Sequence, residues 1–325
     1  MRKLIWITVI STCIVVLGTA QAVPPGYDAA SFARTGIGVR ALGMGGAFCA
    51  IAQGPTGAYW NPAGLAQLGD FQAEGMYTDW LGAGIDLQYL TLAGYPPIGE
   101  ERPALSLEGR PVQFGLSWLS VHVRDIPWWE EEGGYGTFDT WSYLIIASLG
   151  WQLEQSPSVS IGLNVKLYHD RILEGRSFGL GYDVGLMWRQ QLLGIPVSFA
   201  FVTTDLGGTE VQWYGTTGEP VNYVPWLARV GLAAELPVWE GIRLICAASY
   251  EWGVDRPRFE RLRLGGELSL EWLALRAGYD WLLTDPAGKW TAGLGISPWP
   301  WLAIDYAFLP GKLGDTHLLA LRVEF

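Results

Sequence analysis

The segment RLRLGGELSLEW, residues 261–272, alternates between polar and apolar side chains over its whole length. Its leucines and Trp272 fall on one face, whereas Arg261, Arg263 and Glu267 fall on the other. Successive side chains of a β-strand point to opposite faces, so this period of two predicts a strand with one apolar face. A soluble β-sandwich contains such strands too, and the rest of the chain has to decide between a sandwich and a membrane barrel.

The same alternation recurs from residue 71 to the carboxyl end, and residues 161–168 and 319–325 show it as clearly. The predicted strands are about ten residues or longer, which is the length that a tilted strand needs to cross a bilayer. The even number of strands is typical of bacterial outer-membrane barrels, so we expect an all-β fold, a transmembrane antiparallel β-barrel over residues 71–325. Cutting the chain at turn signals predicts about 14 strands, at residues 71–81, 84–95, 111–125, 139–153, 159–172, 177–190, 195–206, 223–237, 242–254, 259–272, 273–283, 289–299, 301–309 and 316–325.

The connections between these strands predict the orientation of the barrel. Short inner turns and long outer loops are typical of such barrels, whose termini both lie on the periplasmic side. Residues 126–138 and 205–222 are long and polar and are expected to be outer loops. Residues 96–110 break the pattern, because this long connection falls on the inner side.

The composition agrees with a surface that faces lipid. Half of the residues are hydrophobic and 16% are charged, well below the roughly 25% of soluble domains. Many of the 18 Trp residues lie near predicted strand ends, where aromatic girdles meet the lipid headgroups; a carbohydrate-stacking platform is the alternative. The net charge of −11, without a cluster of Lys and Arg, argues against nucleic acid as a partner. Outer-membrane lipid is the partner that we expect.

The first 22 residues have the pattern of a signal peptide. Two basic residues, 2–3, precede an apolar stretch at 4–17 and a small-x-small cleavage site at 20–22, so the mature chain is expected to begin at Val23. A lipoprotein signal ending at Cys13 is the alternative, but its apolar region would be short. We therefore expect the protein to be exported to the outer membrane of a Gram-negative-type cell.

No pattern of catalytic or metal-binding residues stands out in the sequence. His122, His169 and His317 lie on separate predicted strands without metal-ligand spacing, and no Gly-x-Ser-x-Gly elbow occurs. Cys49 and Cys246 are expected to be unpaired thiols, one buried and the other on an outer apolar face. The sequence therefore predicts a protein that is not an enzyme, with no cofactor and no metal.

Residues 34–68, RTGIGVRALGMGGAFCAIAQGPTGAYWNPAGLAQL, differ from everything that follows. The segment is rich in Gly and Ala and carries few charges. Such a composition suits a compact plug packed inside the barrel, since glycine lets the backbone turn or approach a neighbour closely. We expect residues 23–70 to form this plug, with a motif made of Gly43, Met44, Gly45, Gly46, Trp60, Asn61, Pro62, Ala63 and Gly64.

Charged side chains with the parity of the polar strand face are expected to point into the lumen. The main hypothesis is that they form opposite-sign ladders between neighbouring strands and anchor the plug, because unpaired charge in a confined lumen is costly. A selective path for polar solutes is the alternative. The candidate lumen-facing charges are Lys166, Arg243, Glu251, Arg261, Arg263, Glu267, Arg276, Asp280, Asp305 and Arg322.

Four short blocks of the sequence resemble one known family. Residues 42–48 and 59–65 are similar to the amino-terminal signature of PorV/PorQ-like outer-membrane proteins, a branch of the FadL (OmpP1-like) fatty-acid transporter superfamily. Residues 305–308 and 313–317 are similar to the closing motif of that family. The resemblance implies a 14-stranded barrel whose amino-terminal segment folds into the lumen as a plug.

The resemblance implies two functions from different classes. The first is a FadL-like transporter or channel for hydrophobic or amphipathic small molecules, in which plug and lateral wall opening pass the ligand toward the membrane. The alternative is a PorV-like component of a type IX-like secretion system, whose partners are exported and secretion-system proteins. The connection at residues 79–84 is only a few residues long, and in the transporters this region helps to capture ligand.

Overall fold

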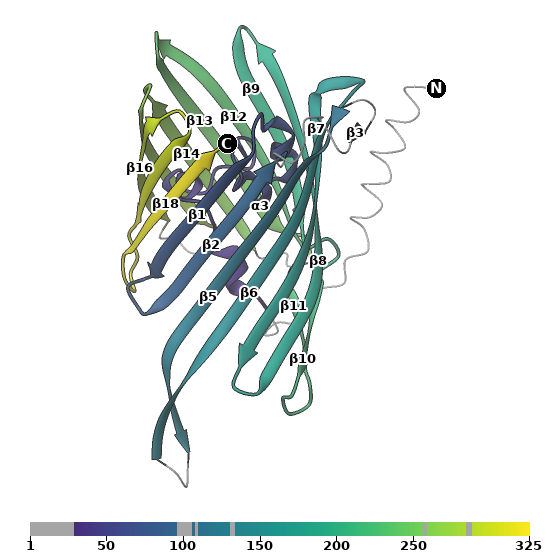
Figure 1. Cartoon of the computed structure of the whole chain (residues 1–325), viewed down its shortest axis with the longest axis vertical. Coiled ribbons are helices and arrows are strands. Elements are labelled where there is room, and N and C mark those ends of the chain that lie inside the picture. Colours follow the sequence, from purple (N-terminus) through teal and green to yellow (C-terminus); the bar gives the residue numbers. More distant parts are fainter. Residues whose placement is uncertain (1–28, 96–105, 108–109, 131–133, 256–258, 284–287) are drawn as a thin grey trace.

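The computed structural model describes residues 29–95, 106–107, 110–130, 134–255, 259–283 and 288–325. Fourteen strands form a closed antiparallel barrel, in which each strand pairs with its neighbours and β18 pairs with β1 (Figure 1). The prediction of an antiparallel barrel with about 14 strands is confirmed. The barrel strands are β1 (Gln72–Trp80), β2 (Ile85–Gly94), β5 (Gln113–Glu130), β6 (Gly134–Leu153), β7 (Ser156–Ile172), β8 (Gly175–Leu192), β9 (Ile195–Thr204), β12 (Leu227–Trp239), β13 (Ile242–Gly253), β14 (Glu260–Ser269), β15 (Leu273–Leu282), β16 (Lys289–Trp299), β17 (Leu302–Leu309) and β18 (Thr316–Glu324).

The two rims of the barrel differ. At the rim that holds Phe325, the strands are joined by short turns except between β2 and β5, and short turns are typical of a periplasmic side. We call the other end the outer rim. Strands β5 to β8 contain 17 to 20 residues, whereas β1, β2 and β13 to β18 contain 8 to 12. The barrel therefore has a tall flank at β5–β8 and a low flank at β13–β18 (Figure 1).

Both predicted outer loops lie on the outer side, but each contains strand residues that the sequence did not predict. Pairing of β5 with β6 continues past a register shift to Glu130 and Gly134, through most of residues 126–138. Within residues 205–222, β10 (Thr209–Tyr214) pairs with β8, and β11 (Val221–Val224) pairs with β10. Polar composition indicated loops, but backbone groups outside a membrane can still pair in a ladder. On the inner side, β3 (Ser106–Leu107) and β4 (Arg110–Pro111) form a small hairpin within the long connection.

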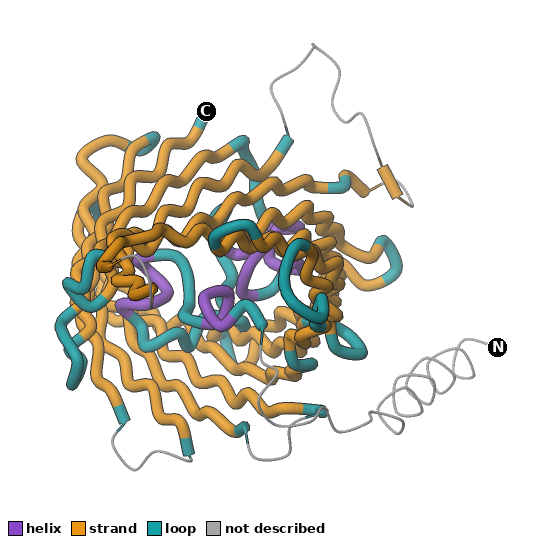
Figure 2. Tube along the Cα trace, turned by 90° about the horizontal axis from the view of Figure 1, so that it is seen from below, coloured by secondary structure: helices purple, strands orange, loops and turns teal. Residues whose placement is uncertain are grey.

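The amino-terminal segment (residues 29–70) lies inside the ring of strands (Figure 2). Its elements are η1 (Ser31–Arg34), α2 (Val39–Gly43), α3 (Gly57–Trp60) and η2 (Pro62–Gln67). The backbone N–H of Ala29 donates to the carbonyl of Tyr223 in β11 at 2.9 Å, so the described chain begins in the outer half. The amino terminus itself lies outside the described residues, so its predicted place at the inner end stays a prediction. Residues 1–28, with the predicted signal peptide, lie outside the described residues.

The outward faces of the strands are apolar, as the alternation predicted. Exposed side chains on these faces include Leu116, Leu163, Val165, Leu180, Leu232, Leu264, Leu275, Leu319 and Leu321. Exposed Trp residues lie beside both rims, namely Trp239, Trp272, Trp299 and Trp301 at the Phe325 rim and Trp281 and Trp290 at the outer rim, whereas Trp128 and Trp129 lie farther out, near the end of β5. These positions match the two aromatic girdles of membrane barrels. Among the described residues, no helix combines the length and the apolar character that crossing a membrane requires.

Candidate functional site: the lumen

Glycines on the inner faces of the strands let the amino-terminal segment lie directly against the barrel wall. A Cβ atom added to Gly162 of β7 would overlap the carbonyl of Pro62, and one added to Gly278 of β15 would overlap the backbone nitrogen of Gly45. Side chains at these positions would hold the segment away from the strands. The wall is therefore shaped to receive the Asn61-Pro62 turn and the glycine-rich turn.

The glycine-rich part of the motif is bound by Thr291 of β16. The Thr291 Oγ1 accepts the backbone N–H of Gly45 at 3.0 Å and donates to the carbonyl of Gly43 at 3.1 Å. Gly45 and Gly46 have φ values of 66° and 76°, a region that favours glycine. Met44, between Gly43 and Gly45, is fully buried. These residues form a tight turn whose polar backbone groups are satisfied by the wall.

The second part of the motif is a turn centred on Asn61. The Asn61 Nδ2 donates to the carbonyls of Cys49 and Leu186, at 3.0 and 3.2 Å, so this side chain joins the segment to β8. Its Oδ1 accepts the backbone N–H of Ala63 at 3.0 Å and caps η2, with Pro62 at the first helical position. Ala63 and Gly64 are buried in the same turn. The motif therefore acts through local backbone geometry and not through exposed chemistry.

Trp60 joins the motif to the charged lumen. Its Nε1 donates to the carbonyl of Ile37 at 2.8 Å, and the guanidinium groups of Arg229 and Arg263 lie 5.2 and 5.7 Å from the ring. Glu251 of β13 lies between the two arginines, accepting the Arg229 Nε–H at 2.6 Å and the Arg263 Nη2–H at 3.3 Å. The two arginines, the Glu251 carboxylate and the Trp60 indole thus form one buried cluster.

A second ion-pair chain holds α2 to the wall. Arg40 donates from Nε and Nη2 to the two carboxylate oxygens of Glu267, both at 2.7 Å. Glu267 also accepts from Arg276 at 2.6 Å, and Arg276 donates to Asp305 at 2.5 Å. Burial lowers the pKa of Arg40, but the Glu267 carboxylate outweighs this effect and the pKa is raised. Arg40 therefore stays charged, and its bidentate contact with Glu267 holds the segment against the wall.

The remaining predicted lumen charges lie in different surroundings. Lys166 is buried between Asp183 and Asp205, at 2.8 and 2.9 Å. Arg261 and Arg263 both face Asp280, at 3.1 and 3.7 Å. Arg322 lies inward, opposite Glu74 in the β18–β1 register, and Arg243 is exposed at the Phe325 end of β13. The sequence reading missed the charged residues Arg40, Glu74, Asp183, Asp205 and Arg229. Three of them, Glu74, Asp183 and Arg229, lie on strands and could have been found from the polar–apolar alternation there.

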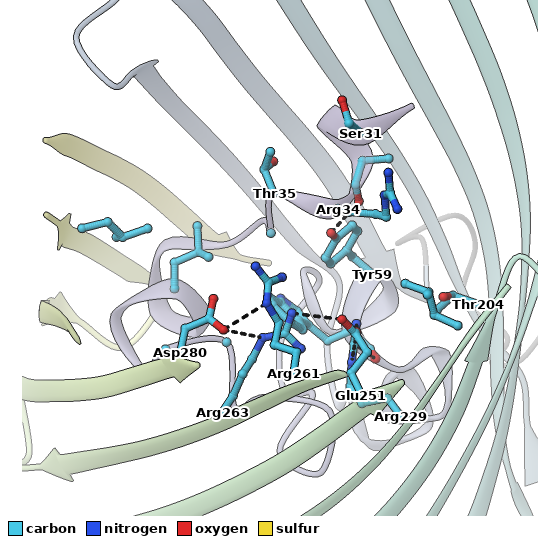
Figure 3. Close-up of a pocket in the computed structure, with 18 of the residues that line it drawn as sticks. Ser31, Arg34, Thr35, Tyr59, Thr204, Arg229, Glu251, Arg261, Arg263 and Asp280 are labelled. Atoms are coloured by element: carbon cyan, nitrogen blue, oxygen red, sulfur yellow. Dashed lines mark hydrogen bonds and ion pairs between the residues drawn. The ribbon is translucent and has the colours of Figure 1, made fainter. Parts of the chain in front are cut away.

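A cavity of about 300 Å³ lies between the amino-terminal segment and the barrel wall (Figure 3). The segment contributes Arg34, Thr35, Tyr59 and Trp60 to its lining, and the wall contributes mainly residues from the outer ends of strands. Arg229, Glu251, Arg261, Arg263 and Asp280 lie together on one side in Figure 3. The cavity is large enough to hold a small molecule between the packed segment and the barrel wall.

The histidines make local contacts only. His122 pairs with Asp139 at 3.1 Å, His169 contacts the carbonyl of Ser177 at 2.7 Å, and His317 contacts the Tyr306 hydroxyl at 2.7 Å. Over the described ranges, no three His, Cys, Asp or Glu side chains gather in a way that could hold a metal. Cys49 is buried, Cys246 is exposed, and both are free thiols.

Comparison with solved structures places the fold. The Pseudomonas putida toluene transporter TodX is similar with a TM-score of 0.56 and 12% identity, covering 89% of this chain and 99% of that one. A Pseudomonas aeruginosa FadL homologue gives 0.52 and 12%, covering 88% and 97%. The Ralstonia pickettii toluene transporter TbuX gives 0.51 and 13%, covering 89% and 98%. This chain has the FadL-like barrel fold. No family model and no curated protein matches the sequence.

Proposed function

We propose that this protein is an outer-membrane transporter or channel for hydrophobic or amphipathic small molecules and not an enzyme. The observation that carries the proposal is a cavity of about 300 Å³ between a segment packed inside a 14-stranded barrel and the outer ends of several of its strands. A site of this kind can take up a molecule from the cell surface and hold it above a closed passage. Two solved barrels with this fold are described as toluene transporters, which supports the same kind of function here.

In this proposal residues 23–70 are the plug. The packing of motif residues against strand glycines and the bidentate Arg40–Glu267 contact favour a segment that closes the straight route through the barrel. A molecule in the cavity then needs either a movement of the segment or an exit through the wall toward lipid. Residues 1–22 are proposed to be the signal peptide that brings the chain to the outer membrane.

Uptake by intact cells tests the transport function. Gram-negative cells that lack their own hydrocarbon channels would express the protein, and entry of radiolabelled toluene and octanoate would be measured against cells with an empty vector. We expect faster entry of at least one of the two compounds. Equal rates with and without the folded protein in the outer membrane would contradict the proposal.

Protein export is the second candidate, and the tall flank is the observation that favours it. Pairing of β5 with β6 extends to Glu130, and Trp128 and Trp129 are exposed near its end, as aromatic residues at protein interfaces often are. The resemblance to the PorV/PorQ-like branch points the same way. Purification in mild detergent decides between the candidates, because a secretion component should retain large partners in fixed stoichiometry, whereas a transporter should retain lipid alone.

A further inference from the structure

A transverse row of outward-facing side chains crosses the outer part of the tall flank and continues onto β10. The strand register places Arg171 of β7 directly opposite Arg176 of β8. Trp141 of β6 lies opposite Arg171 on one side of this pair, and Tyr214 of β10 lies opposite Arg176 on the other. Both arginines are exposed and have the parity of the exposed leucines of their strands. Two cations thus lie side by side on the outer surface of the wall, between two aromatic side chains.

The height of this row on the barrel is that of the outer lipid headgroups. Exposed Phe178 and Trp188 lie on the same face of β8, ten residues apart, with Trp188 toward the Phe325 rim. At about 3.4 Å per residue and a tilt of about 40°, they are separated by roughly 26 Å along the membrane normal, close to the apolar band of about 25 Å of such barrels. Arg176 lies two residues beyond Phe178, so its guanidinium group reaches the headgroups just outside this band.

The protein supplies no counter-charge to the two arginines. Like charges directly opposite each other on neighbouring strands are destabilising, yet neither Arg171 nor Arg176 forms an ion pair with any described residue. Glu174 lies in the turn between β7 and β8 and is exposed, but it pairs with neither of them. Arg124 on β5 of the same flank is balanced, because it pairs with Asp86 at 3.0 Å. An anion between the two guanidinium groups would replace their repulsion by attraction.

We propose that Arg171 and Arg176 bind a phosphorylated glycolipid of the outer leaflet, with a phosphate group of lipid A between the two guanidinium groups. Arginine suits this ligand, because its planar guanidinium group donates two parallel hydrogen bonds to a phosphate. The acyl chains lie along the apolar outer faces of β7 and β8, and the amphipathic rings of Trp141 and Tyr214 flank the headgroup. This inference goes beyond the proposed transport function and depends only on the place of the barrel in the outer membrane.

Diphosphoryl lipid A and the same lipid without its phosphates test the proposal, because the two share sugars and acyl chains and differ in charge. Binding of each to the purified full-length protein in detergent would be measured by native mass spectrometry over a range of lipid concentrations. We expect the phosphorylated form to bind at least tenfold more tightly, and a higher ammonium acetate concentration to weaken it selectively. Phosphatidylglycerol, which carries a single phosphate charge, should bind more weakly than diphosphoryl lipid A.

The Arg171→Gln and Arg176→Gln variants should each lose roughly tenfold in affinity for diphosphoryl lipid A, with binding of the dephosphorylated form unchanged. Arg243→Gln is the matched control, because Arg243 is also exposed but lies at the Phe325 end of β13, away from the outer leaflet. Heat-modifiable migration would verify that each variant has folded, and two separate test variants allow for the failure of one.

Three results would overturn the proposal. They are equal binding of phosphorylated and dephosphorylated lipid A, equal binding of phosphatidylglycerol and diphosphoryl lipid A, and equal losses in the test and control variants. Uptake of toluene and octanoate by cells is a separate measurement, so any of these results would leave the transport function standing.

Discussion

Arg40 is the residue that connects the charge network of the wall to the amino-terminal segment. It makes two hydrogen bonds to Glu267, which Arg276 also contacts. The sequence singled out Glu267 and Arg276 by strand parity but gave no weight to Arg40, because a lone arginine in an apolar segment carries no period. Pairing across 227 positions in sequence is a property of the closed barrel and cannot be derived from local pattern.

The Arg40→Gln substitution should loosen the segment. Removing one partner of a buried ion pair costs about 3–5 kcal/mol when the other charge stays unpaired, and less here because Arg276 still faces Glu267. We expect faster proteolysis within residues 29–70 in the folded protein. Gel electrophoresis and mass spectrometry would measure the rate and the site of cleavage. Arg243→Gln provides the control. Cleavage rates equal to those of the unchanged protein would show that Arg40 does not hold the segment.

Cys49 should be unreactive in the folded protein. Burial raises the pKa of its thiol to about 11, so that the reactive thiolate is scarce at neutral pH, and the raised pKa means that the fraction grows only as pH rises toward that value. In a Cys246→Ala background, iodoacetamide at pH 8 should label Cys49 only after unfolding. Rapid labelling of the folded protein would mean that the segment leaves the lumen.

At the scale of elements, period-two alternation predicted the barrel strands well. In β7, for example, Lys166 and Asn164 point inward while Leu163 and Val165 are exposed, as their parity requires. Alternation could not separate β10 and β11 from a loop, because outside the lipid neither face of a strand has to be apolar. The contacts of the motif could not be predicted either, since the glycines that receive it are spread over several strands.

The strand glycines that receive the segment should tolerate no side chain. In Gly278→Ala the added Cβ would overlap Gly45, so we expect a loss of about 1–3 kcal/mol from overpacking. The measurement is the temperature at which the folded band is lost in heat-modifiability gels. Gly75→Ala in β1 is the control, because a Cβ there meets no atom within 4 Å. Equal midpoints for both variants would contradict the close fit.

At the scale of the whole molecule, the sequence predicted a closed barrel with an inner segment, and the uneven height was missed. Strand ends were placed at polar residues near 125 and 139, whereas the β5–β6 ladder runs to Glu130 and Gly134. Hydropathy along a strand indicates where its lipid-facing part ends, but it does not indicate where its backbone pairing ends.

Deleting residues 23–70 from the mature chain should open the barrel. In planar bilayers we expect long-lived ionic conductance from the shortened protein and little from the full one, because the proposed plug is the part of the chain that lies inside the ring of strands. Heat-modifiable migration would verify that the shortened barrel has folded. Equal conductance of the two folded forms would argue against a plug.

The unequal flanks also give the protein a preferred side of access. Strands β13 to β18 end early, and Lys289, the first residue of β16, lies there on the cavity wall. We therefore expect a molecule from the cell surface to enter the cavity mainly over this low flank. Crowding by surface polysaccharide or by neighbouring proteins on that flank would slow ligand capture, whereas the same crowding beside β5–β8 would leave capture unaffected.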